Sequence, residues 1–169
     1  MPQPSPLTLD AIDQRILHHL QNEGRLTNLE LAERVGLSPS PCLRRVKRLE
    51  DERIIERYVA LVDQSSLGLE VTVFIRVSLS VQEDASLSRF EAAVAEWPEV
   101  MECYLMSGEA DYQMRVIVRS LADYESFLRS RLTKVPGVAK IQSSFALRLV
   151  VYRTELPLSS ATAATGHAR

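Results

Sequence analysis

A short basic segment carries the clearest chemistry in this sequence. Four of the five residues from Arg44 to Arg48 are arginine or lysine, and the acidic run Glu50 to Glu52 follows after Leu49. Guanidinium and ammonium groups bind phosphate oxygens, and arginine can also donate two parallel hydrogen bonds to the edge of guanine. The segment therefore either binds double-stranded DNA or is a solvated helix face that pairs with the acidic residues after it.

Total charge does not decide between these two interpretations. The formal net charge is -2, and the first 62 residues carry equal numbers of acidic and basic side chains. A protein that coats nucleic acid without sequence preference is expected to be strongly basic, so that class is disfavoured. A sequence-specific reader needs only a local placement of basic groups.

The second candidate site is the loop from Ser107 to Tyr112, with the sequence SGEADY. Gly108 permits a positive φ and Asp111 can bond the local backbone, which is typical of a hairpin loop. Alternatively, amides near Gly108 could receive a carboxylate and Asp111 an ammonium, so that the loop would bind a zwitterionic amino acid. The residues alone leave both interpretations open.

Nothing in the sequence predicts catalysis, a metal site or a cofactor. His18 and His19 fall on the first expected helix, and His167 falls near the C-terminus. No set of cysteine, histidine or carboxylate residues has metal-ligand spacing or a nucleophile-base arrangement. Cys42 and Cys103 are most simply buried small hydrophobic residues. An enzyme is therefore disfavoured.

Three helices are expected to position the basic segment. Apolar residues at helical spacing predict a first helix from about Asp10 to Asn22. The run Thr27 to Glu30 has the form of a capping box, and Gly36 is expected to end this second helix in a left-handed conformation. The third helix opens in the run Ser38 to Pro41, where either serine can be the cap. This order predicts a helix-turn-helix.

The third helix is expected to have an apolar face and a basic face. Its inward stripe is predicted to contain Cys42, Leu43, Val46 and Leu49, while Arg44, Lys47 and Arg48 point outward with Arg45 on the flank. Side chains near the start of such a helix reach base edges, and those further along bind phosphates. We assign Ser40, Pro41 and Arg44 to bases. The DNA-binding candidates are Ser38, Ser40, Pro41, Arg44, Arg45, Lys47 and Arg48.

Apolar residues beyond the third helix predict a wing. Ile54-Ile55 and the run Tyr58 to Val62 are rich in β-branched and aromatic residues. We expect them to form a short hairpin that packs beside the helices.

The second half of the chain changes to period two. Strands are predicted at Val71 to Val81, at Val100 to Met106, at Tyr112 to Val118 and from Ile141 through Leu149. Two helices separate them, one ending at Pro98 and one before Pro136-Gly137. This order is that of a ferredoxin-like βαββαβ domain. Its helices cover one face of the sheet, so we expect the other face to dimerise.

The predicted fold class is therefore α+β, with two domains. We expect a winged helix-turn-helix over 8–62, a hinge over 63–69, a ferredoxin-like domain over 70–156 and a disordered tail over 157–169. No run of residues has the length and apolarity of a membrane helix, and Met1 to Pro6 has no signal-peptide pattern. A cytoplasmic protein without a membrane partner is expected.

The sequence resembles the Lrp/AsnC family of transcription regulators. The run Leu31 to Glu50, LAERVGLSPSPCLRRVKRLE, is similar to the recognition segment of that family. The run Ser107 to Tyr112 is similar to the family's ligand loop, and VPGV at Val135 to Val138 also matches. The resemblance extends from about Leu9 to Leu156.

This resemblance implies a winged helix-turn-helix joined to a RAM domain, named for regulation of amino acid metabolism. It implies homodimers that assemble into tetramers or octamers, an amino-acid effector bound between RAM domains, and control of amino-acid metabolism genes. Leucine or methionine is the expected effector, because apolar side chains lie near the sheet edge. The effector-binding candidates are Gly108, Glu109, Ala110, Asp111, Tyr112, Ser143 and Ser144.

Two other classes of function are disfavoured by the sequence. A ligand-binding or assembly module could use its helical domain to contact protein, but the groove-facing basic residues disfavour it. An enzyme would rest only on the ferredoxin-like fold, which is weak evidence of function.

Overall fold

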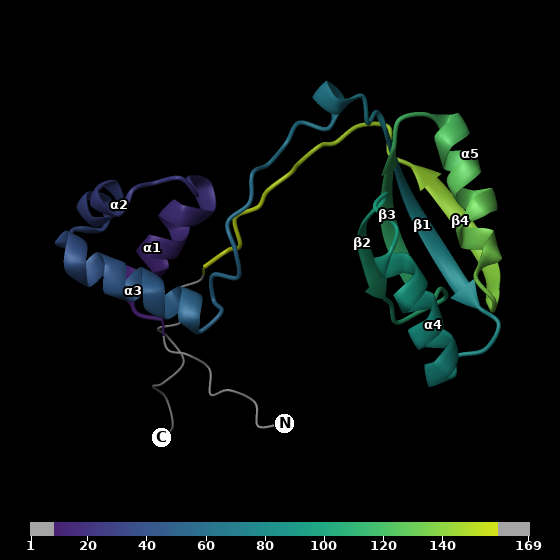
Figure 1. The fold of residues 1–169 in the computed structure, drawn as a ribbon, viewed down its shortest axis with the longest axis horizontal. Helices are drawn as coiled ribbons and strands as arrows, with labels where there is room; N and C mark the ends of the chain where they lie inside the picture. Colours follow the sequence, from purple (N-terminus) through teal and green to yellow (C-terminus); the bar gives the residue numbers. More distant parts are fainter. Residues whose placement is uncertain (1–8, 159–169) are drawn as a thin grey trace, which may run out of the picture. The chain divides into compact units, whose positions relative to one another are not determined.

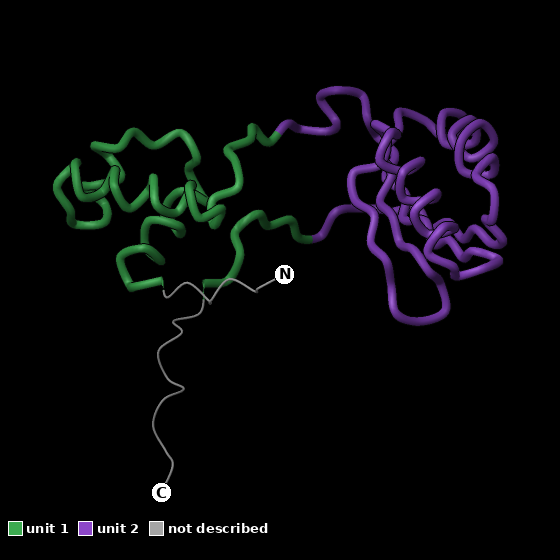
Figure 2. Tube along the Cα trace, turned by 60° about the horizontal axis from the view of Figure 1, so that its bottom comes forward, with its two compact units in different colours: residues 1–61, 151–169 green, residues 62–150 purple. Residues whose placement is uncertain are grey.

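The structure is a computed structural model that describes residues 9–158 (Figure 1). Met1 to Pro6, His167 and all but the first two residues of the predicted tail lie outside the described residues. The chain forms two compact units. One contains the described residues up to Leu61 and those from Val151 onward, and the other is Val62–Val150 (Figure 2).

The first unit contains helices α1 (Ala11–Asn22), α2 (Asn28–Val35) and α3 (Pro39–Asp51). The carboxylate of Asp10 caps α1, and the predicted capping box of Thr27 and Glu30 opens α2. Gly36 has a φ of 69° and ends α2 in the left-handed region, which glycine adopts without steric cost. Ser38 is the N-cap of α3, and its side chain makes no capping hydrogen bond. The three predicted helices are confirmed.

The core of this unit differs from the prediction at one position. Cys42 and Leu49 are fully buried, and Val46 packs against the same cluster. Leu43 was expected to join them, but it is 44% exposed. The buried residues follow each other at spacings of four and three, and Leu43 lies about 100° around the helix from Cys42. That prediction was wrong.

The predicted wing hairpin is also wrong, because residues 52–62 contain no strand. Ile54 and Ile55 both donate their amides to the carbonyl oxygen of Leu49, at 2.9 and 3.0 Å, and both pack against the helical core. Their amides are therefore committed to the end of α3. Tyr58, Val59, Leu61 and Val62 instead lie in an extended and exposed segment.

The second unit is the predicted βαββαβ domain. Its elements are β1 (Val71–Leu79), α4 (Asp84–Ala95), β2 (Val100–Leu105), β3 (Tyr112–Val118), α5 (Leu121–Ser130) and β4 (Val138–Phe145), with short 3-10 turns at Ser65–Leu67 and Leu132–Lys134. The sheet has the order β2-β3-β1-β4, and all three neighbouring pairs are antiparallel.

The last strand ends earlier than predicted. Phe145 pairs with Val73, and the Ala146 amide then donates to the Thr72 carbonyl oxygen at 2.9 Å. β1 begins at Val71, so later residues have no neighbouring strand beside them. Leu147 and Leu149, which were expected to continue β4, are accordingly exposed.

The two faces of the sheet have different surroundings. Val73, Ile75 and Val77 of β1 are buried in one core with Phe90 of α4 and Phe127 of α5, so both helices cover the same face. The alternate side chains of β1, Phe74 and Arg76 among them, are exposed on the other face.

Among the helices of residues 9–158, none combines the length and the apolarity that a membrane span needs.

Candidate DNA-reading helix and ligand loop

The outer face of α3 presents its basic residues in two different states. Arg44 and Lys47 are exposed, and neither forms an ion pair with any described residue. Ser38 and Ser40 are exposed at the start of the helix, and Pro41 is half-buried. This end of α3 therefore offers hydroxyl and guanidinium groups to a ligand without first breaking contacts within the protein.

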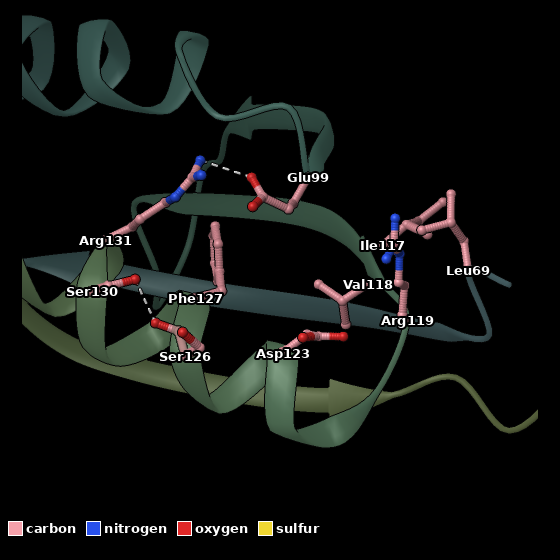
Figure 3. A pocket seen from close by; sticks show the side chains of 10 residues that line it. All are labelled: Leu69, Glu99, Ile117, Val118, Arg119, Asp123, Ser126, Phe127, Ser130 and Arg131. Carbon is pink, nitrogen blue, oxygen red and sulfur yellow. Dashed lines mark hydrogen bonds and ion pairs between the residues drawn. The ribbon is translucent and has the colours of Figure 1, made fainter. Parts of the chain in front are cut away.

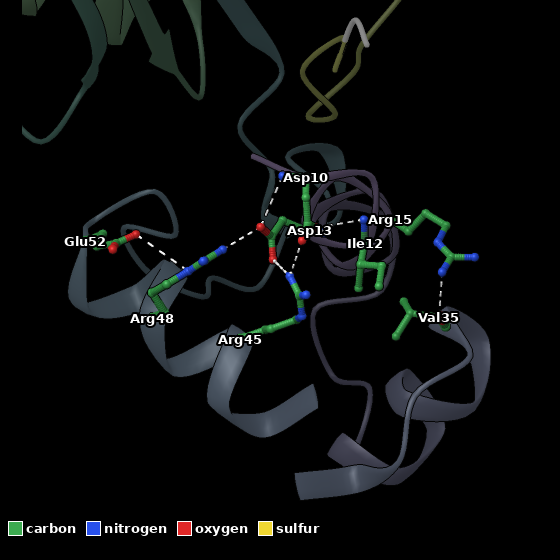
Figure 4. Close-up of polar contacts among 8 residues, drawn as sticks. All are labelled: Asp10, Ile12, Asp13, Arg15, Val35, Arg45, Arg48 and Glu52. Atoms are coloured by element: carbon green, nitrogen blue, oxygen red, sulfur yellow. Dashed lines mark hydrogen bonds and ion pairs between the residues drawn. The ribbon is translucent and has the colours of Figure 1, made fainter. Parts of the chain in front are cut away.

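Arg45 and Arg48 are instead held by an acidic residue of α1 (Figure 4). Arg45 Nη1 donates to Asp13 Oδ1 at 2.8 Å, and Arg48 Nη2 donates to Asp13 Oδ2. Asp13 is only 1% exposed, whereas the arginine side chains are 29% and 42% exposed. The buried carboxylate therefore has two cationic partners that still reach solvent.

Asp10 extends this cluster at the start of α1. Its Oδ2 accepts from Arg45 Nη1 at 2.7 Å, and its Oδ1 accepts from the amides of Ile12 and Asp13. The hydrogen bond from the Asp13 amide is the main cause that lowers the pKa of Asp10, and Arg45 adds to it. The same cluster raises the pKa of Arg45. These contacts lock α3 against α1.

A further arginine supports the helix-turn-helix turn. Arg15 Nη2 donates to the carbonyl oxygen of Val35 at 2.6 Å (Figure 4). Val35 is the last residue of α2, where carbonyl groups lack intrahelical partners. Arg15 thereby satisfies one of these groups from α1.

Sequence analysis missed Asp13, although a signal was present. Leu9, Ile12, Ile16, Leu17 and Leu20 form the apolar stripe of α1, and Asp13 occupies a position within that stripe. An acidic residue at a core-facing position needs a partner, because burying an unpaired charge is costly. The basic segment of α3 supplied that partner.

The loop between β2 and β3 is braced by Asp111, which is 9% exposed. Its Oδ2 accepts from the Leu79 amide at 2.6 Å, and its Oδ1 accepts from Gln82 Nε2 at 2.5 Å. Its own amide donates to the Val77 carbonyl oxygen at 3.0 Å. Gly108 has a φ of 137°, a conformation that requires glycine. The carboxylate expected to meet an ammonium is therefore already bonded to the end of β1.

Tyr112 lies in the core beside this loop. It is 1% exposed, its ring packs on Phe90 with centroids 4.5 Å apart, and its hydroxyl donates to Glu91 Oε1 at 2.8 Å. Burial is the main cause that raises the pKa of Tyr112. This residue therefore supports the loop from inside the domain.

The structure separates the two serines predicted to flank the effector. Ser143 pairs with Ile75 on the helix-covered face and shares a hydrogen bond with the Tyr124 hydroxyl. Ser144 pairs with Phe74 and is exposed on the other face. They cannot both contact one small molecule on a single face of the sheet.

Other polar residues gather beside the loop on the uncovered face. A depression of about 20 Å³ is lined there by Arg76, Ser78, Glu109, Ala110, Lys140 and Gln142. Arg76, Lys140 and Glu109 form no ion pair with a described residue. The space holds about one water. Sequence analysis missed Arg76 and Lys140, whose signal was the polar alternate face of β1 and β4.

No group of three or more histidine, cysteine or acidic residues within 9–158 is arranged to hold a metal ion.

Comparisons with known proteins match both halves of the chain. Residues 72–156 match the Lrp/AsnC ligand binding domain, and residues 9–56 match a winged helix-turn-helix DNA-binding domain. The chain is 48% identical over 150 residues to the Bkd operon transcriptional regulator of Pseudomonas aeruginosa, covering 89% of this chain and 98% of that protein. It is 44% identical over 142 residues to the leucine-responsive regulatory protein of Rhizobium meliloti, covering 84% and 91%.

The fold is similarly matched by solved structures. A transcriptional regulator of Neisseria meningitidis, determined as its complex with L-Met, superposes with a TM-score of 0.86. It is 44% identical in sequence, and the match covers 89% of this chain and 97% of that one.

Proposed function

The chain belongs to the Lrp/AsnC family of transcriptional regulators, and we propose that it controls amino-acid metabolism genes in the cytoplasm in response to a small amino acid. It is a DNA-binding regulator with a helix-turn-helix domain and a ligand-binding domain, and not an enzyme. We take 8–62 as the DNA-binding domain, 63–69 as the hinge and 70–156 as the effector and assembly domain.

The start of α3 reads base edges in this proposal. The observation that carries it is that Arg44 and Lys47 are exposed and unpaired on α3, while the neighbouring basic residues are tied to α1. Arg44 lies closer to the N-terminal end of the helix, together with Ser40 and Pro41, so it is assigned to bases. Lys47 is assigned to phosphate. Arg45 and Arg48 contact phosphate through the parts of their guanidinium groups that remain in solvent.

The effector binds beside the ligand loop on the uncovered face of the sheet. Arg76 and Lys140 offer cationic donors to a carboxylate, and Glu109 offers an acceptor to an ammonium. Asp111 holds this loop in place through its bonds to Leu79 and Gln82. Methionine is the first candidate effector because the Neisseria regulator was solved with L-Met, and leucine is the second.

A second copy of the chain completes this effector site. The depression beside the loop is about 20 Å³, which is too small for an amino acid, so further walls are needed. The exposed Phe74 on the same face favours its burial against a partner. We propose homodimers that form through this face and assemble further into tetramers or octamers.

The proposal is tested by sequencing genomic DNA fragments that the purified protein retains, with and without amino-acid mixtures. We expect a recurring sequence whose recovery changes when methionine or leucine is present. Retention of all fragments in proportion to their abundance would contradict a sequence-specific reader. Unchanged recovery with every amino acid would contradict the effector assignment alone.

A further inference from the structure

A larger cavity lies at the opposite end of β3 from the ligand loop (Figure 3). The loop precedes Tyr112, where β3 begins, whereas this cavity is built around Val118 and Arg119, where β3 ends. Its volume is about 320 Å³, within the range of about 300 to 1,000 Å³ that is usual for small-molecule sites. The cavity is therefore separate from the effector site proposed above and large enough for an amino acid.

Apolar side chains form part of its lining. Val118 of β3 and Phe127 of α5 both belong to the core on the helix-covered face and are only 4% and 3% exposed, so they close the inner side of the cavity. Leu69 adds an apolar contact from the segment before β1. Leu69 is only partly buried, so it gives an apolar group of a ligand the main surface on which to pack.

Charged groups of both signs line the same cavity. Arg131 Nη1 and Glu99 Oε2 are 2.8 Å apart and neutralise each other. Arg119 and Asp123 also line it, but within the described residues neither takes part in an ion pair. Among residues 9–158, the donor to Asp123 Oδ2 is the Ser120 hydroxyl, at 2.9 Å. One cation and one anion are thus available beside apolar surface.

We propose that this cavity is a second small-molecule site, and that it binds a zwitterionic amino acid with an apolar side chain. Arg119 receives the carboxylate, Asp123 receives the ammonium, and Leu69 packs against the apolar group. Charge-assisted hydrogen bonds of this kind are about twice as strong as neutral ones. The proposal does not depend on the assignment of the ligand loop.

The position of Leu69 connects this cavity to the hinge. The Leu69 amide donates to the Gln64 carbonyl oxygen at 3.1 Å, and Gln64 Nε2 donates to Thr72 Oγ1 at 3.1 Å. The segment that leads into β1 is therefore fastened next to the cavity. A ligand that packs on Leu69 is expected to slow amide exchange in residues 64–69, because it stabilises the closed form of this segment.

Calorimetric titration of the full-length protein with each of the twenty amino acids tests this site. The decisive variant is Arg119→Gln, and the matched control is Arg129→Gln, which changes an exposed arginine of α5 that does not line the cavity. We expect at least one apolar amino acid to bind with two classes of site in the wild type. Arg119→Gln should weaken one class about tenfold or more, and Arg129→Gln should weaken neither.

A loop variant separates this proposal from the effector proposal. Glu109→Gln should weaken the other class of site and leave the Arg119-dependent class unchanged. If Arg119→Gln and Arg129→Gln give the same isotherms as the wild type, the cavity is not an amino-acid site, whatever Glu109→Gln does. Loss of all binding in Glu109→Gln would equally assign every bound ligand to the loop and overturn the second site.

Discussion

The two units each bury one acidic side chain, and they satisfy it in different ways. Asp13 of the helical unit accepts from Arg45 and Arg48, which are charged and partly exposed. Asp111 of the sheet unit accepts from the Leu79 amide and from Gln82, which are neutral. Within 9–158, they are the two buried residues whose side chains are acidic.

This difference has a consequence for function. The partners of Asp13 reach solvent, so they can share their donors with a phosphate without leaving the protein. One partner of Asp111 is the backbone amide of Leu79 at the end of β1, whose position is fixed by the strand. In the helical unit, ion pairs thus position Arg45 and Arg48 for DNA. In the sheet unit, hydrogen bonds from neutral groups fix the ligand loop.

Removal of the ionic brace should have the largest effect on stability. Asp13→Ala removes the buried carboxylate that Arg45 and Arg48 share, and only the exposed pair of Arg45 with Asp10 then joins α3 to the start of α1. We expect the free energy of unfolding of the helical unit to fall by about 3 kcal/mol. This value is at the lower end of the usual range for a broken buried ion pair, because water can still hydrate the two arginines. Urea unfolding followed by circular dichroism measures this loss.

Glu52→Ala is the matched control for that variant. Glu52 lies 3.9 Å from Arg48 on the surface, and a pair of this kind contributes little. Equal effects of Asp13→Ala and Glu52→Ala would show that the buried pair does not hold the helices together.

Removal of the neutral brace should have a smaller effect. Asp111→Ala leaves the amide of the buried Leu79 without its hydrogen-bond acceptor. We expect this loss to lower the stability of the sheet unit by about 2 kcal/mol. Amide exchange at Leu79 should accelerate. Glu109→Ala, at an exposed position of the same loop, should change stability by less than about 0.5 kcal/mol. A destabilisation by Glu109→Ala as large as that by Asp111→Ala would contradict the role of the buried carboxylate.

The smallest expected effect concerns the helix cap beside the ionic brace. Asp10→Ala removes the acceptor for the amides of Ile12 and Asp13, which costs about 1 kcal/mol at neutral pH. The pKa of Asp10 is lowered in the folded protein from its ordinary value of 3.8. Its stabilisation is therefore complete well above pH 3.8 and is lost as the pH falls through the lower, folded-state pKa.

Unfolding curves of the wild type and Asp10→Ala at a series of pH values test this dependence. The difference between the two proteins should shrink as the medium is acidified below pH 3.8. A difference that stays constant down to the lowest pH would mean that the ionised carboxylate is not the capping group.

Local patterns in the sequence predicted most of the fold. The cap at Thr27, the left-handed Gly36 and the period-two strands depend on neighbouring residues, so they could be recognised without tertiary information. The prediction of a wing hairpin was wrong because the amides of Ile54 and Ile55 bond to the end of α3. The β propensity of these two residues does not reveal those bonds. The prediction that Leu149 continues β4 was wrong because a strand needs a neighbour, and β1 begins only at Val71, after the residues that would lie opposite Leu149.

The candidate sites were predicted less completely, because side-chain partners are tertiary facts. The sequence located the basic segment. It could not show that Arg45 and Arg48 are paired while Arg44 and Lys47 are free, because the partner, Asp13, lies more than 30 residues away. The ligand loop was located as well. Its bracing by Leu79 depends on how β1 and β3 pair. The opposite faces of Ser143 and Ser144 follow from the period of two and could have been predicted, whereas the hydrogen bond between Ser143 and Tyr124 could not.

The most direct test of this account measures DNA affinity for Arg44→Ala and Lys47→Ala on the recovered preferred site and on random duplex, over a range of salt concentrations. Arg44→Ala should weaken binding to the preferred site by about 1 to 3 kcal/mol more than binding to random DNA. Lys47→Ala should weaken both alike and reduce the salt slope by about 1. Equal losses on both duplexes for Arg44→Ala would contradict base reading by α3.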